Sequence, residues 1–320
     1  MKKTPLKVGI ITDPIASINP KKDSSFAMAV EANRRGADLY YFEQKHLFIS
    51  SGKAFGISTQ LSVNDNDNDK KWFELGTQEK IALGDLDVIL MRKDPPFDME
   101  YVYTTYILER AKVDGALIVN DPQALRNMNE KIFTSWFSEC TPLTLITRCI
   151  DEMKAFLKQH NKIVVKPLDG MGGQSVFVVQ KDDKNANVIF ETLTENGKCF
   201  AMTQIFVPDI IYGDKRILIV DGEPIPYALA RIPSEDDNRG NIVAGASTKG
   251  QKLSNEDLKI CSIVGPVLKE QGVLFAGIDV IGNFLTEINV TSPTGIRELD
   301  KQFNLNIAGV LFDTIEYNLS

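Results

Sequence analysis

Short apolar runs alternate with segments of helical spacing along the first third of the chain. The runs KVGIIT, LYYFE, LDVILMR and GALIVN have the composition of strands, and SSFAMAVEANRRG and MEYVYTTYILERAK have the pattern of helices. Ser24 or Ser25 is the expected cap of the first helix, and Gly36 its expected end. Strands that alternate with helices form βαβ units, so residues 1–125 are predicted to be a small α/β sheet domain.

From about residue 126 the pattern changes. NEKIFTSWF and DEMKAFLKQH are predicted to be helical, and KIVVKPL, QSVFVVQ and CFAMTQIFV to be strands. RILIVDGEPIPYALARI is predicted to be two strands joined at Asp221-Gly222, because Asp-Gly is a strong hairpin turn. A helix at SNEDLKICSIVGPVLKE, a strand pair at LFAGIDVIG and FLTEINV, and a helical tail complete the chain.

Two polar stretches interrupt these elements. Residues 233–253, PSEDDNRGNIVAGASTKGQKL, have little periodicity and many turn formers, and a loop of that length is usually functional or disordered. The stretch VNDNDNDKKW has the three alternate aspartates of a calcium loop, but Lys70 stands where such a loop needs glycine and Gly76 where it needs its closing glutamate. A solvated hairpin or loop is therefore predicted there.

Composition narrows the class of protein. The 320 residues are 43 % hydrophobic and 25 % charged, which is typical of a globular protein with more than one core. No signal peptide and no apolar stretch of about 18 residues is found, so a cytoplasmic location is expected, with no membrane partner. The net charge of −7 disfavours nucleic-acid binding, and two histidines and four scattered cysteines disfavour a histidine triad, a zinc site or a disulfide framework. The cysteines are expected to be reduced and structural.

The stretch VVKPLDGMGGQSV ends a strand on Lys166 and then turns through Gly170, Gly172 and Gly173. Backbone N–H groups of a glycine-rich turn can approach phosphate oxygens closely, and an ammonium group beside them neutralises the charge. Neither a P-loop nor a dinucleotide-binding fingerprint is present. A triphosphate site is one interpretation of this stretch, and a flexible hairpin is the other.

Three oxygen donors occur on a predicted strand pair near the C-terminus. Glu287 and Asn289 are two residues apart and point to one side of a strand, and a turn at residues 282–284 places Asp279 opposite Glu287. Two facing carboxylates repel one another, and a divalent cation would remove that conflict. This donor set suits Mg²⁺ with phosphate oxygens, whereas a solvated polar face is the alternative.

Further candidates follow the strand that ends in TQIFVP. An apolar strand edge with free backbone groups can hold an adenine, and Asp214 a few residues later can bond ribose hydroxyls, although a turn residue is the simpler interpretation. Arg216, Arg231 and Arg239 flank or lie within the long loop. Each could bind carboxylate or phosphoryl oxygens bidentately, or lie on the surface.

These motifs together resemble the ATP-grasp ligases, and more narrowly the prokaryotic glutathione synthetases. The resemblance rests on MRKDPPFD, TYILERA, NEKIF, KPLDGMGG, GDKRILIVDGEPIPYALARIP, RGN and LTEINVTSPTGIRE, and it covers essentially the whole chain. It implies an ATP-grasp fold, in which two α+β lobes at residues 126–206 and 207–320 clasp ATP behind an N-terminal pre-ATP-grasp domain. The DNDNDNDK segment and AGASTKGQKL are not matched.

The implied activity is the ATP-dependent joining of γ-glutamylcysteine to glycine through an acyl phosphate, with release of ADP and phosphate. Magnesium or manganese would be the metal, and the loop at 233–253 would be a lid over the intermediate. The resemblance also implies a homo-oligomer, a tetramer in the bacterial enzymes. Other ATP-grasp carboxylate–amine ligases, or a regulatory protein that binds ATP without turnover, are the alternatives.

The resemblance also implies a role for each candidate residue. The phosphates would be held by Lys131, Lys166 and the turn Gly170, Met171, Gly172 and Gly173. The adenine would lie at Gln204, Ile205, Phe206 and Val207, with its ribose at Asp214. The metal would be held by Asp279, Glu287 and Asn289. The acyl phosphate and the peptide would be bound by the catalytic Arg216, Arg231 and Arg239 and by Arg92, Ser292, Pro293 and Arg297.

Overall fold

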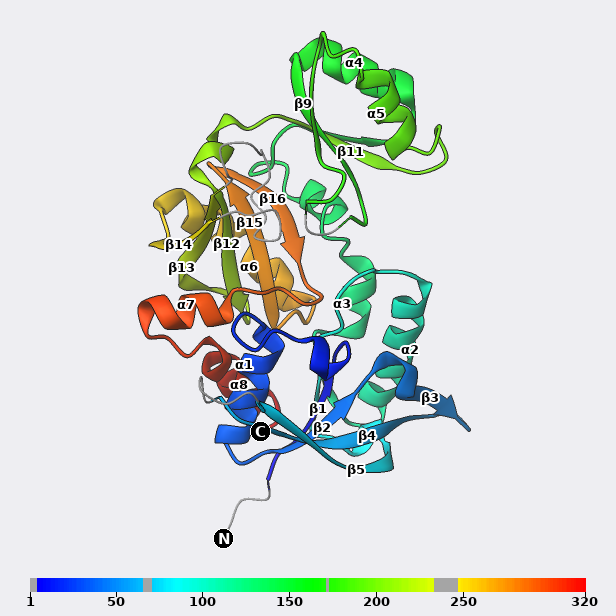
Figure 1. The fold of residues 1–320 in the computed structure, drawn as a ribbon, viewed down its shortest axis with the longest axis vertical. Coiled ribbons are helices and arrows are strands. Elements are labelled where there is room, and N and C mark those ends of the chain that lie inside the picture. The colour runs from blue at the N-terminus through cyan, green and yellow to red at the C-terminus, as the bar shows by residue number, and fades with distance from the viewer. Residues whose placement is uncertain (1–4, 66–70, 171–172, 233–246) are drawn as a thin grey trace.

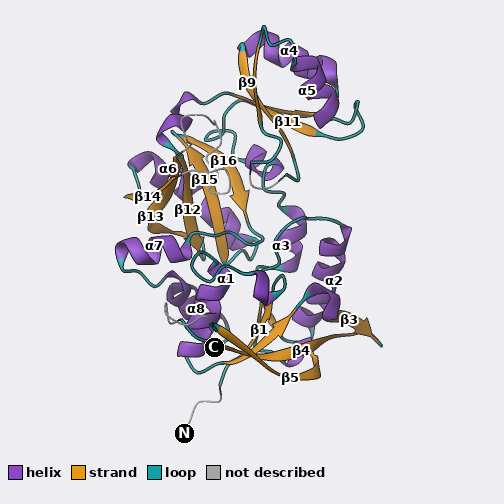
Figure 2. Ribbon diagram, viewed as in Figure 1, coloured by secondary structure: helices purple, strands orange, loops and turns teal. Residues whose placement is uncertain are grey.

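The computed structural model describes residues 5–65, 71–170, 173–232 and 247–320. Within them the chain forms three β-sheets (Figure 1). The N-terminal sheet lies at one end of the molecule, a smaller lobe lies at the other, and the third sheet lies between them. Helices flank each sheet, as the α/β class predicts (Figure 2).

The N-terminal sheet has the order β3-β4-β2-β1-β6-β7. Its seventh strand, β5, lies outside this order and pairs with β4. Its strands are β1 (Lys7–Ile11), β2 (Asp38–Phe42), β3 (Leu47–Ser50), β4 (Lys53–Val63), β5 (Phe73–Ala82), β6 (Val88–Met91) and β7 (Leu117–Val119). Its helices are α1 (Ser24–Arg34), α2 (Met99–Val113) and α3 (Pro122–Asn127), with 3₁₀ turns η1 (Ile15–Ser17), η2 (Gln44–His46) and η3 (Leu83–Asp85).

Both faces of the central parallel strands are buried, which is why their sequences read as continuous apolar runs. Val8 and Ile10 of β1 pack with α1 in one core, whereas Ile11 packs with α2 in another. This alternation is the two-residue period of a strand. The expected βαβ arrangement is therefore present, and it is extended by the antiparallel strands β3, β4 and β5.

The small lobe has a four-stranded antiparallel sheet, in the order β10-β9-β11-β8, covered by two helices. Its elements are β8 (Thr144–Thr147), α4 (Ile150–His160), β9 (Lys162–Pro167), β10 (Phe177–Gln180), α5 (Ala186–Leu193) and β11 (Ala201–Ile205). The core of the lobe, which includes Met153, Val165 and Phe190, is separate from the other two cores. The lobe is therefore a packing unit of its own.

The third sheet has the antiparallel order β14-β13-β12-β15-β16. Its strands are β12 (Asp214–Val220), β13 (Glu223–Ile232), β14 (Ser247–Lys252), β15 (Phe275–Ile281) and β16 (Phe284–Asn289). The remaining elements are η4 (Ile132–Trp136), η5 (Pro208–Tyr212), α6 (Asn255–Glu270), α7 (Ile296–Phe303) and α8 (Ile307–Asn318).

The N-terminal domain and the third sheet share continuous hydrophobic cores. Val8 and Phe26 belong to the same buried cluster as Leu218 and Phe312, so α8 packs beside α1 (Figure 1). Arg35 extends this contact with ion pairs to Asp313 at 2.6 Å and Glu316 at 2.9 Å. The two parts form one body, on which the small lobe sits.

Several local expectations need correction. Asp23 caps α1 by accepting from the Phe26 N–H at 2.8 Å, in place of Ser24 or Ser25. The stretch NEKIFTSWF forms the 3₁₀ helix η4, and the end of the expected loop at 233–253 forms β14, paired with β13. Residues 233–246 and 66–70 lie outside the described residues. Met128, Phe133 and Phe137 pack in the core of the body, although the expected division assigns them to the lobe.

None of the helices in the described part of the chain is long and apolar enough to cross a membrane. All four cysteines are unpaired. Cys140 and Cys261 are buried as expected for structural residues, whereas Cys149 and Cys199 are exposed.

The β12–β13 hairpin packs unusually close to α6. Asp221 and Gly222 both have positive φ, 51° and 84°, as a tight hairpin turn requires. A Cβ added to Gly265 of α6 would lie only 2.0 Å from the Gly222 carbonyl oxygen. Backbone atoms on both sides fix this approach, so no side-chain rotation can relieve an overlap.

We therefore predict that Gly265→Ala lowers the free energy of unfolding by about 2 kcal/mol, because overpacking at this contact outweighs the gain in helix propensity. Urea unfolding measures the change, with Ser262→Ala on the exposed face of the same helix as the control. A Gly265→Ala variant as stable as the native chain would contradict the close packing.

Candidate active site

A cavity of about 800 Å³ lies between the small lobe and the third sheet. The lobe contributes Lys166 and Gln204 to its lining, and the third sheet contributes Asp279 and Glu287. The far end is formed by residues of the N-terminal domain, among them Lys22. The glycine-turn lysine and the oxygen-donor strands, more than 100 residues apart in sequence, therefore meet at one site.

Lys166 lies on β9, where it pairs in register with Met202 of β11. Its side chain is buried, and its Nζ lies 3.6 Å from Glu287 Oε1 and 3.5 Å from the Thr286 carbonyl oxygen. Burial lowers the pKa of Lys166, and the charge of Glu287 opposes that shift only in part. The strand thus holds an ammonium group against the donor pair on the facing sheet.

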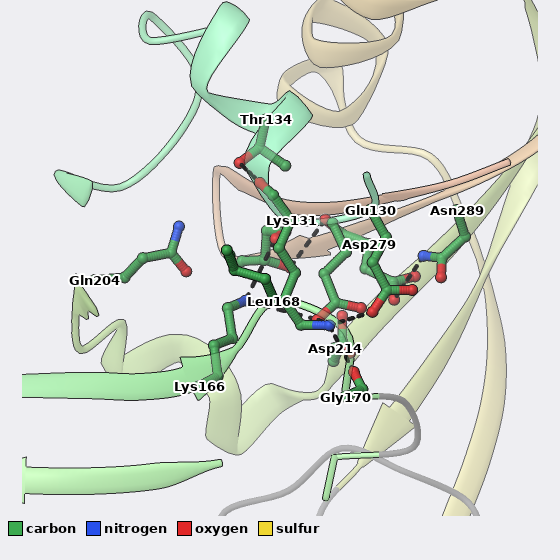
Figure 3. A network of polar contacts seen from close by, with 12 residues as sticks. Glu130, Lys131, Thr134, Lys166, Leu168, Gly170, Gln204, Asp214, Asp279 and Asn289 are labelled. Atoms are coloured by element: carbon green, nitrogen blue, oxygen red, sulfur yellow. Dashed lines mark hydrogen bonds and ion pairs between the residues drawn. The ribbon is translucent and has the colours of Figure 1, made fainter. Parts of the chain in front are cut away.

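Lys131 connects this pair to the glycine turn (Figure 3). Its Nζ donates to the Glu130 carboxylate and, at 2.6 Å, to the Gly170 carbonyl oxygen, and it lies 3.9 Å from Glu287 Oε1. Burial opposes its charge, but Glu287 and Glu130 outweigh burial and raise the pKa of Lys131. Lys131 is therefore a fixed cation that joins three parts of the site.

The glycine turn is as tight as its sequence implies. A Cβ on Gly170 would lie 2.6 Å from Pro167 Cγ, and Gly173 has a φ of +72°, which L side chains rarely adopt. Met171 and Gly172 lie outside the described residues. Gly173 itself lines the cavity.

Asp279 faces Glu287 across β15 and β16, as the turn at residues 282–284 predicts. The opposite side of the same strands is apolar, and Ile278, Val280, Ile288 and Val290 lie in the core there. The strand pair therefore presents its acidic side to the cavity and its apolar side to the interior.

Arginines surround Asp279. Arg216 binds it through Nε and through Nη2, the latter at 2.9 Å from Oδ2, and Arg231 Nη2 lies 2.8 Å from the same oxygen. Burial opposes the ionised form of Asp279, yet the two guanidinium groups hold its pKa well below its usual range. Gly277 makes room for this arrangement, since a Cβ there would lie 2.7 Å from Arg216 Cδ.

Asp214 begins β12, opposite Arg231 of β13. Arg231 Nη2 donates to Asp214 Oδ2 at 2.5 Å, whereas Asp214 Oδ1 and Arg231 Nε are buried atoms without a hydrogen-bond partner among the described residues. Burial raises the pKa of Asp214 despite the neighbouring Arg231. The pair lines the cavity with bonding capacity to spare.

The facing carboxylates do not depend on a metal for charge balance. Asp279 is neutralised by arginines and Glu287 lies beside two lysines, so the repulsion expected between them is relieved by the protein. No group of three or more His, Cys, Asp or Glu that could hold a metal occurs among the described residues. Asp279, Glu287 and Asn289 supply two carboxylates and an amide, a hard-oxygen set that fits Mg²⁺ when phosphate oxygens complete the shell.

The strand end at residues 204–207 lines the opposite wall of the cavity. The Gln204 side chain donates to Thr144 Oγ1 at 2.9 Å, which fixes it in the buried wall. The centroid of the Phe206 ring lies 3.6 Å from Lys162 Nζ. Ile205 and Val207 line the same apolar pocket as Val164 and Ile281.

The expected substrate residues separate into two groups. Ser292 and Pro293 line the cavity, and Ser292 donates to Asp94 at 2.5 Å. Arg92 lies behind that wall and donates to the carbonyl oxygens of Thr291 at 3.3 Å and Pro293 at 2.8 Å. Arg297 is outside the lining and forms a bidentate ion pair with Asp65, and Arg239 falls outside the described residues.

Some lining residues were not anticipated. Glu130 accepts from Lys131, and its pKa is raised by burial and by the charge of Glu287. Its only sequence signal is its place beside Lys131 in NEKIF. Lys22 and Glu298 line the far end, and no local motif marks them as neighbours. Only the packing of the chain ends brings them together.

Comparisons with known proteins agree along nearly the whole chain. The family model "Prokaryotic glutathione synthetase, N-terminal domain" matches residues 6–126, and "Prokaryotic glutathione synthetase, ATP-grasp domain" matches residues 130–304. The glutathione synthetase of Shewanella oneidensis is 55 % identical over 98 % of this chain and 99 % of its own length. That of Vibrio parahaemolyticus is 54 % identical over 97 % and 98 %.

Solved structures share the fold at low identity. The D-cycloserine synthetase DcsG superposes with a TM-score of 0.68 at 13 % identity, covering 98 % of this chain and 100 % of that one. The ATP-grasp ligase PsnB, in a structure with a minimal precursor, Mg and ADP, gives 0.62 at 13 % identity, with 98 % of each chain covered. The expected ATP-grasp fold is therefore confirmed.

The Asp279 ion pairs give a testable dependence on pH. A carboxyl group whose pKa is depressed by folding contributes stability above its unfolded pKa, near 3.8, and loses that contribution as the pH falls. Replacement by Asn leaves Arg216 and Arg231 buried without their shared counter-charge. Breaking such a pair costs about 3–5 kcal/mol at neutral pH.

We predict that the stability difference between the native chain and Asp279→Asn is full near neutrality and narrows below about pH 4. Urea unfolding at a series of pH values measures it, with the exposed Asp151→Asn as the control. A difference that stayed constant through the acid range would show that the charge of Asp279 does not stabilise the fold.

Proposed function

The chain belongs to the prokaryotic glutathione synthetase family, and we propose how the residues of its cavity carry out the ATP-dependent synthesis of glutathione. The chain is an ATP-grasp ligase. The observation that carries the proposal is the meeting of Lys166 and the acidic strand pair in one cavity, with Lys131 held beside Glu287.

We propose γ-glutamylcysteine, glycine and ATP as the substrates. In the first step an oxygen of the cysteinyl carboxylate attacks the γ-phosphorus, an acyl phosphate forms, and ADP leaves. In the second step the glycine amine attacks the acyl carbon, the amide bond forms, phosphate leaves, and the amine loses a proton. Neither step requires a nucleophile from the protein, so the presence of only two histidines in the chain is compatible with this reaction.

The phosphates are assigned to Lys131, Lys166 and the turn at residues 170–173. Both ammonium groups are fixed beside Glu287, and Lys131 also holds the turn through the Gly170 carbonyl. Fixed cations stabilise charge that moves during phosphoryl transfer without having to reorganise. The adenine is assigned to the wall at residues 204–207. The ribose is assigned to Asp214, whose Oδ1 has no hydrogen-bond partner in the described part of the chain and can accept from a hydroxyl.

The charge balance of the cavity favours a divalent cation with the nucleotide. Four cations around the acidic strand pair are already paired with carboxylates, namely Lys131 with Glu130, Lys166 with Glu287, Arg216 with Asp279 and Arg231 with Asp214. A triphosphate therefore brings charge that these pairs do not neutralise. Asp279, Glu287 and Asn289 would hold Mg²⁺ or Mn²⁺, which offsets phosphate charge when bound.

Arg216 and Arg231 are proposed to stabilise the acyl phosphate and the oxyanion that forms when glycine attacks. Their contacts with Asp279 and Asp214 aim both guanidinium groups along one wall of the cavity. Ser292 and Pro293 are assigned to the dipeptide. Arg239 keeps its proposed catalytic role and residues 233–253 their proposed role as a lid on sequence grounds. Arg92 and Arg297 do not line the cavity, and their proposed substrate roles rest on the family resemblance alone.

The motifs alone are also compatible with two other functions. A ligase for a different acid and amine is disfavoured, because identity to glutathione synthetases is 54–55 % over nearly the full length. A regulatory protein without turnover is disfavoured, because both lysines and all three oxygen donors are in place. We propose the cytoplasm as the location, since the reaction consumes ATP and a thiol dipeptide.

The reaction itself is tested by phosphate release from ATP. With purified protein and Mg²⁺, release should be fast only when γ-glutamylcysteine and glycine are both present, and glutathione should form in equal amount. Release that did not respond to γ-glutamylcysteine would overturn the proposed substrate.

Lys166→Ala tests the phosphate assignment. Removing a fixed cation from a transition state that carries charge should lower kcat/KM by roughly 100- to 1,000-fold, while the circular dichroism spectrum is unchanged. Lys181→Ala, in the exposed turn after β10, is the matched control. A full-rate Lys166→Ala enzyme would remove this residue from the mechanism.

We also propose that the chain assembles as a homo-oligomer, a tetramer by the family resemblance. Helix α2 offers a surface for this, because Met99, Tyr103, Tyr106 and Val113 are each more than half exposed and lie on one face of the helix. Apolar stripes of this kind mark association surfaces on folded proteins.

Placing charges in that stripe with Tyr103→Asp and Val113→Asp together should reduce the mass in solution, measured by light scattering, because burying two carboxylates in an interface is costly. Val188→Asp on α5 is the control, because the Val188 side chain is also more than half exposed. An unchanged mass would move the interface away from α2.

A further inference from the structure

A short segment of the body, residues 129–131, lies between the acidic strand pair and the small lobe. The Ile288 N–H of β16 donates to the Glu130 carbonyl oxygen at 2.8 Å. Ile288 stands between Glu287 and Asn289, the two oxygen donors on that strand. The backbone of residues 129–131, here called the connector, is therefore attached to the strand that carries two of the three proposed metal ligands.

The connector also contacts the start of the glycine turn. Asn129 Nδ2 donates to the Leu168 carbonyl oxygen at 3.1 Å, and Lys131 Nζ donates to the Gly170 carbonyl oxygen at 2.6 Å. Figure 3 shows Leu168 and Gly170 close to Lys131. Both carbonyl groups follow β9 of the lobe, whereas the connector leads into η4, whose Phe133 packs in the core of the body. Two hydrogen bonds thus cross from the body to the lobe here.

Asn129 uses both ends of its side-chain amide. While Nδ2 bonds the lobe, Oδ1 accepts from the Lys131 N–H at 3.1 Å and from the Ile132 N–H at 3.0 Å. An asparagine that bonds the N–H groups two and three residues further on fixes a local turn. Because the amide group is planar and rigid, it ties the position of the Leu168 carbonyl to the path of the backbone at Lys131.

The Lys131 side chain is less suited to this role. Its ammonium group sits on a flexible four-carbon stem and is shared between the Glu130 carboxylate and the Gly170 carbonyl. A nucleotide phosphate competes for the same ammonium group, because charge-assisted bonds are stronger than bonds to a neutral carbonyl. The uncharged amide of Asn129 has no such competitor, so its bond can hold the connector to the turn while phosphate is bound.

We propose that Asn129 is a positioning residue for phosphoryl transfer, which holds the start of the glycine turn in register with Lys131. It acts from outside the cavity, since it is not among the residues that line it. The inference rests on the proposed function and adds to it a residue that sets the geometry of the phosphate end. A misplacement of about 1 Å at a reacting centre can cost about 100-fold in rate.

Asn129→Ser separates this role from the local turn. Serine keeps an oxygen that can accept from the same N–H groups, but it has no amide donor for the Leu168 carbonyl. We expect kcat/KM for ATP to fall roughly 10- to 100-fold, with an unchanged thermal unfolding midpoint and an unchanged KM for glycine. Asn129→Ala, which loses both contacts, should show the same loss of rate and also unfold at a lower temperature.

A double-mutant cycle tests whether Asn129 acts through Lys131. Calorimetry with ATP and Mg²⁺ should show that Asn129→Ser weakens nucleotide binding roughly 10-fold in the native background, the range for one hydrogen bond. In the Lys131→Met background the same change should cost less than about 3-fold, because the lysine that the turn must meet is gone. Asn185→Ser, exposed on the lobe just before α5, is the matched control and should match its parent in both backgrounds.

Two results would overturn the inference. An Asn129→Ser enzyme with the native kcat/KM would show that the bond to Leu168 does not position the turn. A loss that is equally large with and without Lys131, and that follows a fall in the unfolding midpoint, would leave Asn129 only a structural role. Failure of the proposed function would look different, because the native enzyme itself would then release no phosphate with γ-glutamylcysteine and glycine.

Discussion

The ion pair between Arg216 and Asp279 determines how the rest of the cavity can be arranged. It joins neighbouring strands β12 and β15 in register, and Arg231 of β13 reaches the same carboxylate from the next strand. Charges this deeply buried are tolerated only when they are paired and hydrogen-bonded. The pairing therefore ties the position of two candidate catalytic guanidinium groups to the register of three strands, and through it to the fold of the body.

A second constraint is that the cavity lies between two units with separate cores. The small lobe packs around its own apolar cluster, while the body packs around the other two. Polar contacts join them at the site, through the Lys166 pair with Glu287. The Lys131 bond to Gly170 is a second such contact (Figure 3). No hydrophobic core shared with the body fixes the lobe among the described residues. The charged contacts in the cavity therefore supply much of what holds the lobe to the body.

Much of the fold could be predicted because its signals are local. The parallel strands have apolar runs buried on both faces, the hairpin has Asp221-Gly222, and the placement of Asp279 opposite Glu287 follows from a two-residue period and a short turn. Strand β5 could not be found in this way, because its residues are almost all exposed and show no apolar alternation. The stretch NEKIFTSWF is predicted to be helical, but no local signal distinguishes an α-helix from the 3₁₀ helix that it forms where it packs against β16.

The residues of the candidate site can also be divided into those with a local sequence signal and those placed by tertiary packing. Lys166, the glycine turn and the acidic strand pair each carry a local pattern whose chemistry can be recognised before folding is known. Arg92 shows the limit of that approach, since an arginine before KDPP could equally contact a substrate or a backbone, and only the bonds to Thr291 and Pro293 distinguish them. The far end of the cavity depends on Lys22 and Glu298, which come from opposite ends of the chain, so this lining exists only once α1 and α7 are packed together. The part of the cavity that sequence reasoning missed is therefore the part whose charges are placed by tertiary packing and carry no local sequence pattern.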